Sequence, residues 1–314
     1  MKTYDLAIAW NWEYDWDYVN GIQHECRQQG LTVQQIQPPN VSETLEGLRA
    51  GTISFRAFYD RASDADEAFL PLVGLLTQDS IRVINRHEFV RHAVDKATMH
   101  LEFMSHGLHV PYTIILPPYN QKKEIELVSS ELERLGKPFV IKPANTTGGG
   151  TGVVLTAATV QDIYEARQLH KDDKYLLQEK IEPKNLNGKR AWFRVYYAFG
   201  EVIPCWWDDI THRYSEFSPG EEEQFGLGSL RDVLKAIHRI CKLDFFSSEI
   251  AQTTHGDLIV VDYVNEICDM RLQSKYHNGA PDGVVHRIQE LIAIEVERHA
   301  RRIEGPVVSG ESKG

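Results

Sequence analysis

Short apolar runs and segments of helical period alternate along the first ninety residues. The run T-Y-D-L-A-I-A is typical of a strand, and the segment that follows repeats its apolar positions with helical spacing until Gly30. The pattern predicts strands over 3–9, 31–36 and 81–85, helices over 17–29 and 64–77, and a mixed region that contains A-F-Y-D (57–60). We therefore expect a small α/β domain that ends near residue 93.

The remaining chain is predicted to hold more strands toward its C-terminal half. A helix begins after Asp95, a good N-cap residue, and ends at Gly107, which suits a left-handed helix end. Gly200-Glu201 is the predicted turn of a hairpin. The predicted helices are 95–107, 122–135, 159–169, 228–242 and 282–302, and the predicted strands are 109–116, 139–143, 153–156, 175–181, 193–200, 201–207 and a second hairpin over 245–265. We expect residues 305–314 to be a disordered tail.

Composition excludes several classes of protein. The 314 residues are 42% hydrophobic and 25% charged, which is enough apolar material for a packed core. A formal net charge of -11 argues against a broad surface for nucleic acid or for an anionic membrane. No stretch approaches the ~18 apolar residues of a membrane span, and Asp5 interrupts the region where a signal peptide would be apolar. We expect a cytoplasmic protein.

A glycine-rich segment, N-T-T-G-G-G-T-G over 145–152, lies between two predicted strands. A P-loop or a dinucleotide fingerprint needs a helix directly after its glycines, so neither motif fits. A glycine loop between strands can fold over a triphosphate and present backbone N–H groups without side chains in the way. The segment is longer than a tight turn needs and indicates a loop that covers phosphate.

Two lysines lie where a bare ammonium group would be unfavourable. Lys142 is in the apolar strand before the glycine loop, so its charge would be partly desolvated unless an anion meets it. Lys96 follows Asp95 at the start of a helix, where the helix dipole disfavours a cation. A phosphate that bridges both lysines would remove both conflicts, whereas a lysine that reaches solvent from a strand end is the simpler alternative for Lys142.

The hairpin over 245–265 is predicted to bring two carboxylates together. If His255-Gly256 is a two-residue turn, opposing residue numbers sum to 511, and Glu249 faces Asp262. Carboxylates ~5 Å apart repel by roughly 3 kcal/mol at an effective dielectric of about 20, and a divalent cation would relieve this repulsion. Mg²⁺ in phosphate chemistry is held by one or two carboxylates plus phosphate oxygens and waters, to which Asn265 could add an oxygen. A solvated polar face is the alternative interpretation.

These motifs in this order resemble the ATP-grasp superfamily over about residues 90–300, with a preceding α/β domain of the kind that fold commonly carries. The matching strings are V-D-K-A-T-M (94–99), F-V-I-K-P (139–143), T-G-G-G-T-G (147–152), L-L-Q-E-K-I (176–181), A-W-F-R-V-Y-Y-A-F-G (191–200), S-S-E-I-A (247–251) and V-V-D-Y-V-N (260–265). The resemblance is to the carboxylate–amine ligases, which include glutathione synthetase and D-alanine–D-alanine ligase. It implies an α/β protein of the α+β grasp type, with an N-terminal domain (1–93), a central lobe (94–180) and a C-terminal lobe with antiparallel sheets and the metal site (181–304).

The resemblance also implies which residues form the site. ATP would be bound by Lys96, Lys142, Gly148, Gly149, Gly150, Thr151, Gly152, Glu179, Lys180, Ile181 and Glu182. Among these, residues 179–181 would line the adenine pocket and Glu182 is the candidate for the ribose. Mg²⁺ or Mn²⁺ would be held by Glu249, Asp262 and Asn265, and Arg194 would lie near the transferred phosphoryl group.

The spacing of the metal residues departs from the family pattern. Members usually have the second acid two residues before the asparagine, on one face of a strand, whereas Asp262 and Asn265 are three apart. Either a β-bulge restores the alignment or Glu266 takes part instead.

The implied reaction is ATP-dependent and ADP-forming. Most members activate a substrate carboxylate as an acylphosphate, which an amine or similar nucleophile attacks with release of phosphate. The predicted catalytic residues are Arg194, Lys142 and Arg271. Arg213 and Arg271 could hold the substrate carboxylate, since a guanidinium binds it bidentately. Trp12 and Asp15, in the aromatic and acidic segment over 10–18, could meet the amine, and packing at an interface is the alternative.

A small-molecule kinase on the same fold is the second hypothesis. A hydroxyl acceptor would favour a nearby general base, for which Asp208, Asp209 or His212 could serve. A non-catalytic nucleotide-binding module is a third reading, which the presence of both lysines and both acids disfavours. The expected partners are ATP, a carboxylate and an amine, and a homodimer is compatible with the resemblance because dimers are common in this superfamily.

Overall fold

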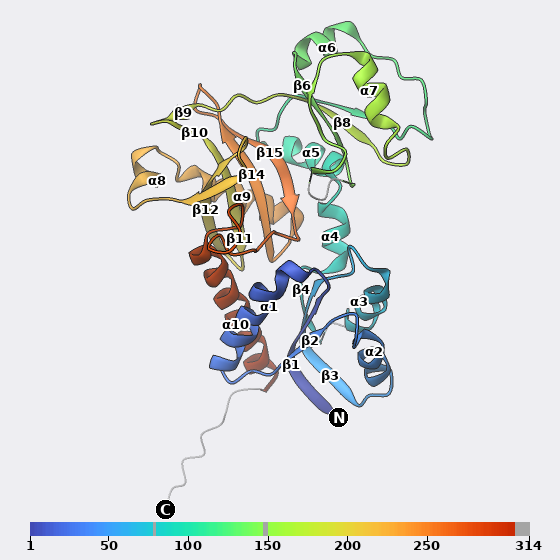
Figure 1. The fold of residues 1–314 in the computed structure, drawn as a ribbon, viewed down its shortest axis with the longest axis vertical. Coiled ribbons are helices and arrows are strands. Elements are labelled where there is room, and N and C mark those ends of the chain that lie inside the picture. The colour runs from blue at the N-terminus through green and yellow to red at the C-terminus, as the bar shows by residue number, and fades with distance from the viewer. Residues whose placement is uncertain (78–79, 147–149, 305–314) are drawn as a thin grey trace, which may run out of the picture.

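The computed structural model describes residues 1–77, 80–146 and 150–304 (Figure 1). The N-terminal domain lies at one end of the long axis, and two further lobes lie side by side toward the other end. The predicted disordered tail lies outside the described residues. The mixed α/β architecture with several antiparallel sheets confirms the predicted fold class.

The N-terminal domain contains a four-stranded parallel sheet in the order β2-β1-β3-β4. Both faces of this sheet are covered, which explains why β1 is buried without a break from Leu6 to Trp10. Its elements are β1 (Lys2–Trp10), η1 (Glu13–Asp15), α1 (Trp16–Gln28), β2 (Val33–Ile36), α2 (Val41–Arg49), β3 (Ile53–Arg61), η2 (Glu67–Phe69), α3 (Leu70–Leu76), β4 (Arg82–Ile84) and α4 (His87–Ala93).

The central lobe is an antiparallel sheet in the order β5-β8-β6-β7. Helices α6 and α7 supply Leu135 and Ile163 to the core beneath it. The elements are α5 (Lys96–Ser105), β5 (Thr113–Leu116), α6 (Ser129–Leu135), β6 (Phe139–Pro143), β7 (Val154–Ala157), α7 (Val160–Arg167) and β8 (Tyr175–Glu179). Helix α5 instead contributes Met99 and Phe103 to the core of the neighbouring lobe.

The C-terminal lobe is a five-stranded antiparallel sheet in the order β13-β12-β11-β14-β15. Its elements are β9 (Asn185–Leu186), β10 (Lys189–Arg190), β11 (Trp192–Ala198), β12 (Glu201–Asp208), β13 (Arg213–Glu216), α8 (Glu221–Gln224), α9 (Ser229–Cys241), β14 (Phe245–Gln252), β15 (Leu258–Asn265) and α10 (Asp282–Glu304). Ala198 pairs with Glu201, so Phe199 and Gly200 form the hairpin turn, one residue earlier than predicted. Both have positive φ, at 49° and 100°, as a type I′ turn requires.

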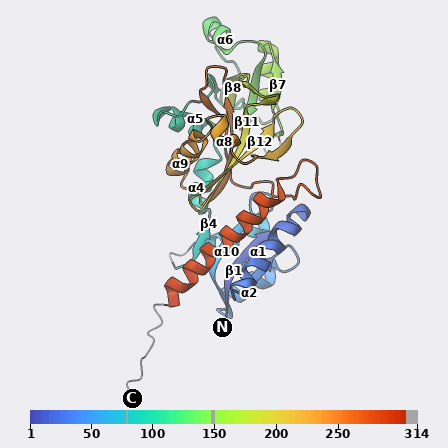
Figure 2. The ribbon, with the colours of Figure 1, turned by 90° about the vertical axis from the view of Figure 1, so that its left-hand side faces the viewer.

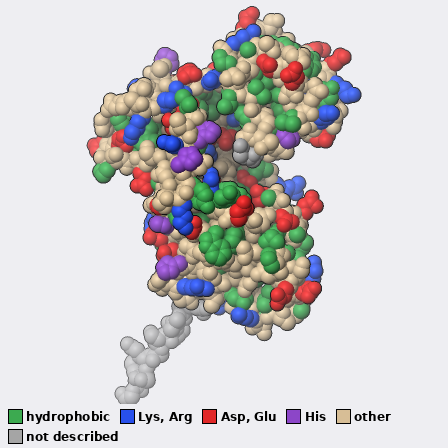
Figure 3. All heavy atoms as spheres, in the orientation of Figure 1, with side chains coloured by type: hydrophobic (Ala, Val, Ile, Leu, Met, Phe, Trp, Pro, Cys, Tyr) green, Lys and Arg blue, Asp and Glu red, His purple; other side chains and the backbone are tan. Residues whose placement is uncertain are grey.

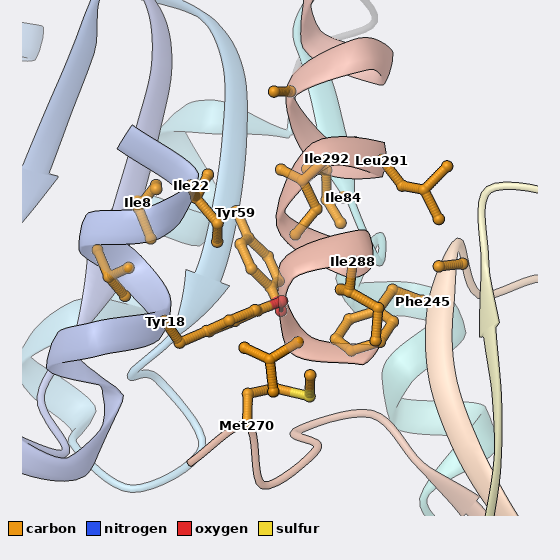
Figure 4. Close-up of a cluster of buried hydrophobic side chains, with 14 of the residues drawn as sticks. Ile8, Tyr18, Ile22, Tyr59, Ile84, Phe245, Met270, Ile288, Leu291 and Ile292 are labelled. Carbon is orange, nitrogen blue, oxygen red and sulfur yellow. Dashed lines mark hydrogen bonds between the residues drawn. The ribbon is translucent and has the colours of Figure 1, made fainter. Parts of the chain in front are cut away.

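The last helix, α10, packs beside α1 on the N-terminal sheet (Figures 1 and 2). Figure 4 shows Ile288 and Ile292 of α10 between Tyr18 and Tyr59 of the N-terminal domain and Phe245 of β14. These residues belong to one hydrophobic cluster, so α10 joins the N-terminal domain to the C-terminal lobe.

Two helices differ from the predicted pattern. Helix α2 was not predicted, although Val41, Leu45 and Leu48 have helical spacing, because the segment lies between the Pro38-Pro39 turn and Gly51. The helix predicted over 122–135 is helical only over Ser129–Leu135. None of the described helices is both long enough and apolar enough to cross a membrane.

Candidate active site

Lys142 is buried at the junction of the two lobes. It lies in β6, and its Nζ donates a hydrogen bond to the carbonyl oxygen of Val261 in β15, at 2.9 Å. Its side chain is only 7% exposed, and burial lowers the pKa of Lys142 to about 8. Asp262 opposes this shift and Lys96 adds to it. A buried ammonium with one backbone partner is a site for an anion.

Lys96 reaches the same carboxylate from the start of α5. Its Nζ lies 3.7 Å from Oδ1 of Asp262, and the Nζ of Lys142 lies 3.8 Å from that oxygen. The helix start is fixed as predicted, because the side chain of Asp95 accepts hydrogen bonds from the N–H groups of Ala97 and Thr98. The structure therefore brings both predicted lysines to one point.

Glu249 and Asp262 are paired directly across β14 and β15, as predicted. The turn is not the predicted two-residue one, since the N–H of Thr253 bonds to the carbonyl oxygen of Asp257 and the register there sums to 510. An irregularity between Glu249 and Ile250 shifts the register by one, which restores the predicted pair. Burial acts to raise the pKa of Asp262, but Lys96, Lys142 and Arg194 outweigh it and hold the pKa well below its usual range.

A second irregularity in the pairing of β14 with β15 accounts for the unusual spacing between Asp262 and Asn265. Ser247 pairs with Asn265 and Glu249 pairs with Asp262, so β15 uses three residues where β14 uses two. Residues opposite one another in a sheet share a face, and Ser247 and Glu249 are two apart. Asp262 and Asn265 therefore lie on the same face. The extra residue in β15 is a β-bulge, which was one of the two possibilities that the spacing left open.

Arg194 of β11 lies next to Glu249. Its Nη2 donates to Oε1 of Glu249, and the indole N–H of Trp192 donates to Oε2 at 3.1 Å. The guanidinium also lies over the ring of Trp207, 5.3 Å from its centroid. Its Nε is buried without a hydrogen-bond partner in the described part of the chain.

The glycine loop is described only at its two ends. Gly148 and Gly149, predicted to cover phosphate, lie outside the described residues together with Thr147. Gly152 has φ +75°, and a Cβ there would lie 3.0 Å from Cγ of Pro143, so this position requires glycine. Gly150 also has positive φ, at +81°, and Thr151 follows it.

Asp173 fixes the start of the glycine loop. It accepts hydrogen bonds from the N–H groups of Asn145 and Thr146 at 2.9 and 3.0 Å, and from both of their side chains. Burial acts to raise the pKa of Asp173, but these hydrogen bonds outweigh it and hold the pKa low. Asp173 was not among the predicted site residues, because nothing in the sequence around it indicates a contact with Asn145, 28 positions earlier.

The segment assigned to adenine connects the two lobes. Glu179 ends β8, and its carboxylate accepts from the N–H of Tyr112 at 2.7 Å. Lys180 and Ile181 follow in the connection, where the predicted strand has already ended. Glu182, the candidate for the ribose, is 70% exposed and lies 3.6 Å from Arg190.

Two of the predicted substrate residues, Arg271 and Asp15, form ion pairs within the protein. Arg271 is held by both carboxylate oxygens of Asp269, and its guanidinium lies 5.6 Å from the ring centroid of Trp12. Arg61 binds both oxygens of Asp15 at 2.8 Å in a fully buried pair. This favours a structural role for Asp15 over the predicted contact with an amine. Arg213 begins β13 and is exposed.

A cavity of about 170 Å³ lies at the carboxyl ends of β3 and β4, where Glu266, the residue after Asn265, contributes to its wall. Phe58 and Val83 contribute apolar wall, while Asp60, Asp64 and Glu266 bring carboxylates. Burial raises the pKa of Glu266 to about 7. Figure 3 shows the surface hollowed where the two lobes meet above the N-terminal domain, with charged side chains around the hollow.

The residues present fit a hard divalent cation. Two facing carboxylates and an amide oxygen on one strand face are oxygen donors, which Mg²⁺ prefers. No group of three or more His, Cys, Asp or Glu side chains within 1–77, 80–146 and 150–304 is arranged to hold a metal. A cation here would therefore depend on phosphate oxygens and waters for the rest of its shell, as Mg²⁺ commonly does.

The topology and the likeness to solved structures show that the chain has the ATP-grasp fold. It is similar over 97% of its length to all of D-alanine–D-alanine ligase from Bacillus anthracis complexed with ATP, at 15% identity and a TM-score of 0.65. A RimK domain ATP-grasp protein from Sphaerobacter thermophilus is similar at 18% identity and a TM-score of 0.63, and the match covers 92% of this chain and 99% of that protein. The ATP-grasp ligase PsnB complexed with minimal precursor, Mg and ADP is similar at 14% identity and a TM-score of 0.62, and the match covers 94% of this chain and 98% of PsnB. No protein-family model and no curated protein matches the sequence.

Proposed function

We propose that this protein is an ADP-forming, Mg²⁺-dependent ATP-grasp ligase that joins a carboxylate to an amine. The observation that carries the proposal is the convergence of Lys96 and Lys142, from the central lobe, on Asp262 of the C-terminal lobe, beside the paired Glu249 and Arg194. This arrangement places three cations and two carboxylates at one point, which suits a nucleotide phosphate and its metal. Structural neighbours with the same fold were solved with ATP, or with Mg and ADP.

Each residue has a role in the proposed reaction. Lys96 and Lys142 bind phosphate oxygens, and the positive charge of Arg194 stabilises the phosphoryl group as it transfers. Glu249, Asp262 and Asn265 would hold Mg²⁺, which neutralises charge on the phosphate oxygens. The substrate carboxylate forms a bond to the γ-phosphorus as the bond to the β-phosphate oxygen breaks. The amine then attacks the acyl carbon, loses a proton, and displaces phosphate.

The kinase alternative receives little support from the geometry. Oδ1 of Asp208 accepts the N–H groups of Ile210 and Thr211, so this carboxylate stabilises a turn. Asp209 is held bidentately by Arg190, and His212 stacks on Trp207. Each proposed base for a hydroxyl acceptor is therefore engaged elsewhere. The carboxylates at the cavity beside Glu266 instead suit an amine substrate.

Mass spectrometry of the purified protein with Mg-ATP and a small-metabolite extract tests the reaction type. A ligase yields ADP, free phosphate and a metabolite that is the condensation product of two others. ADP with a phosphorylated metabolite and no free phosphate would show a kinase instead. The Lys142→Ala protein, which should give none of these products, is the control for contaminating activity.

Lys142→Ala should weaken Mg-ATP binding by about tenfold to a hundredfold. A hydrogen bond to a charged group contributes about 1.5–3 kcal/mol, and 1.4 kcal/mol corresponds to tenfold in affinity. The fold should persist, because the change also removes the cost of a buried ammonium. Calorimetric titration measures the affinity, and Lys171→Ala, an exposed lysine of the same lobe, is the matched control. Equal affinities in both variants would remove Lys142 from the phosphate site.

A further inference from the structure

Beneath Lys142 lies a buried polar cluster that the proposed reaction does not use. It consists of His100 from α5, Thr113 from β5, Gln178 from β8 and Tyr263 from β15. His100, Gln178 and Tyr263 are 3%, 2% and 0% exposed. Burying polar side chains costs free energy unless they form hydrogen bonds, so a polar cluster built from four elements suggests a specific role.

The hydroxyl of Tyr263 is fixed from two sides. Gln178 Nε2 donates to it at 2.6 Å and also to Oγ1 of Thr113 at 3.1 Å. His100 Nδ1 lies 2.7 Å from the same hydroxyl. Since Gln178 already supplies a donor, the single proton of the hydroxyl is free for a neutral His100, which accepts it. The ring of Tyr263 therefore has one position.

That ring lies under Lys142. Nζ is 5.2 Å from the ring centroid, within the range of a cation–π contact. The π face stabilises the cation without accepting one of its three N–H groups as a conventional hydrogen bond. Val261 takes one N–H, and Asp262 at 3.8 Å is beyond hydrogen-bond distance. Two N–H groups thus remain for a ligand.

We propose that Tyr263 is a positioning residue that holds the Lys142 ammonium at the phosphate site, with His100 and Gln178 fixing the tyrosine. The role rests on the proposed function only in taking the ligand of Lys142 to be a nucleotide phosphate. It explains why the polar cluster spans both lobes, because Lys142 belongs to one lobe and Tyr263 to the other. Phe103 meets the Tyr263 ring edge-on, with 5.4 Å between the ring centroids, and contributes apolar packing to that ring.

A double-mutant cycle on Mg-ADP affinity, measured by calorimetry with the full chain, tests the role. Tyr263→Leu removes ring and hydroxyl and should weaken binding about tenfold. In a Lys142→Ala background the same change should have no further effect, because Tyr263 acts through the lysine. Tyr263→Phe retains the ring and should stay within about threefold of the wild-type affinity. Gln178→Met removes the amide that donates to the hydroxyl of Tyr263, and it serves as the test if Tyr263→Leu does not fold. This variant should show a smaller loss of affinity, which should also vanish in the Lys142→Ala background.

Phe103→Leu is the control for general loosening of this core. It should lower the unfolding midpoint while leaving the affinity within about twofold in both backgrounds. A Tyr263→Leu effect that persists at full size without Lys142 would overturn the role of Tyr263 and leave the proposed function intact. An unchanged affinity in Lys142→Ala alone would instead overturn the phosphate assignment, and the role of Tyr263 with it.

Discussion

Replacing Glu249 by Gln and Asp262 by Asn together makes nucleotide binding independent of Mg²⁺ and lowers turnover by about a thousandfold, the loss expected when a group that neutralises transition-state charge is removed. The amides keep the size of the acids but lack the charge that holds a divalent cation. In the absence of metal, the expected change in ADP affinity has the opposite sign. Because Asp262 no longer faces Lys96 and Lys142 at 3.7 and 3.8 Å, metal-free ADP should bind at least as tightly as it does to the wild type.

Titrating ADP with Mg²⁺ and with EDTA separates these two effects. Asp257→Asn, an exposed acid on the loop of the same hairpin, is the same kind of acid-to-amide substitution away from the site and should leave both affinities unchanged. Retention of the Mg²⁺ dependence in the double variant would place the metal elsewhere.

Arg61→Met should destabilise the protein by about 3–5 kcal/mol, because it leaves Asp15 buried and without its partner. Both side chains of this pair are at most 1% exposed, and Arg61 also donates to the carbonyl oxygen of Cys268 at 3.0 Å. The guanidinium thus joins the aromatic segment, β3 and the segment after β15. Thermal unfolding monitored by circular dichroism provides the measurement.

The double variant Arg61→Met with Asp15→Leu should recover much of that loss, since replacing both charges by apolar groups can be nearly neutral. Arg56→Met is the matched control. Its ion pair with Asp5 is of similar length, at 2.9 Å, but the two side chains are 28% and 13% exposed, so the loss of this pair should cost less than about 1 kcal/mol. Equal midpoints for Arg61→Met and Arg56→Met would contradict the distinction between buried and exposed pairs.

Local pattern was sufficient to predict most of the strands and the capped helix at Asp95, because alternation and N-capping act within a few residues. The Glu249–Asp262 pair was correct although the turn was not, since a longer loop and a later irregularity compensate in register. Helix α6 is shorter than predicted because polar periodicity alone does not hold a helix at residues 122–128.

The supports of the site could not be read from the sequence in the same way. Tyr263 meets His100 across 163 residues and Gln178 across 85, and Arg61 meets Asp15 across 46. Such pairs depend on how the lobes pack, for which the chain carries no local mark. A tyrosine next to Asp262 and a histidine inside a predicted helix have ordinary explanations until the lobes are placed.

The position of α10 has a consequence for dividing this protein into pieces. The N-terminal sheet has two apolar faces, and the face that bears Leu6 and Ile8 packs in one cluster with α1 and α10. A fragment of residues 1–93 would carry that face without its second helix, and would expose apolar surface that favours aggregation. Adding the 23 residues of α10 as a separate peptide should cover this face again and keep the fragment in solution. The first domain in the sequence is completed only when the last helix has been made.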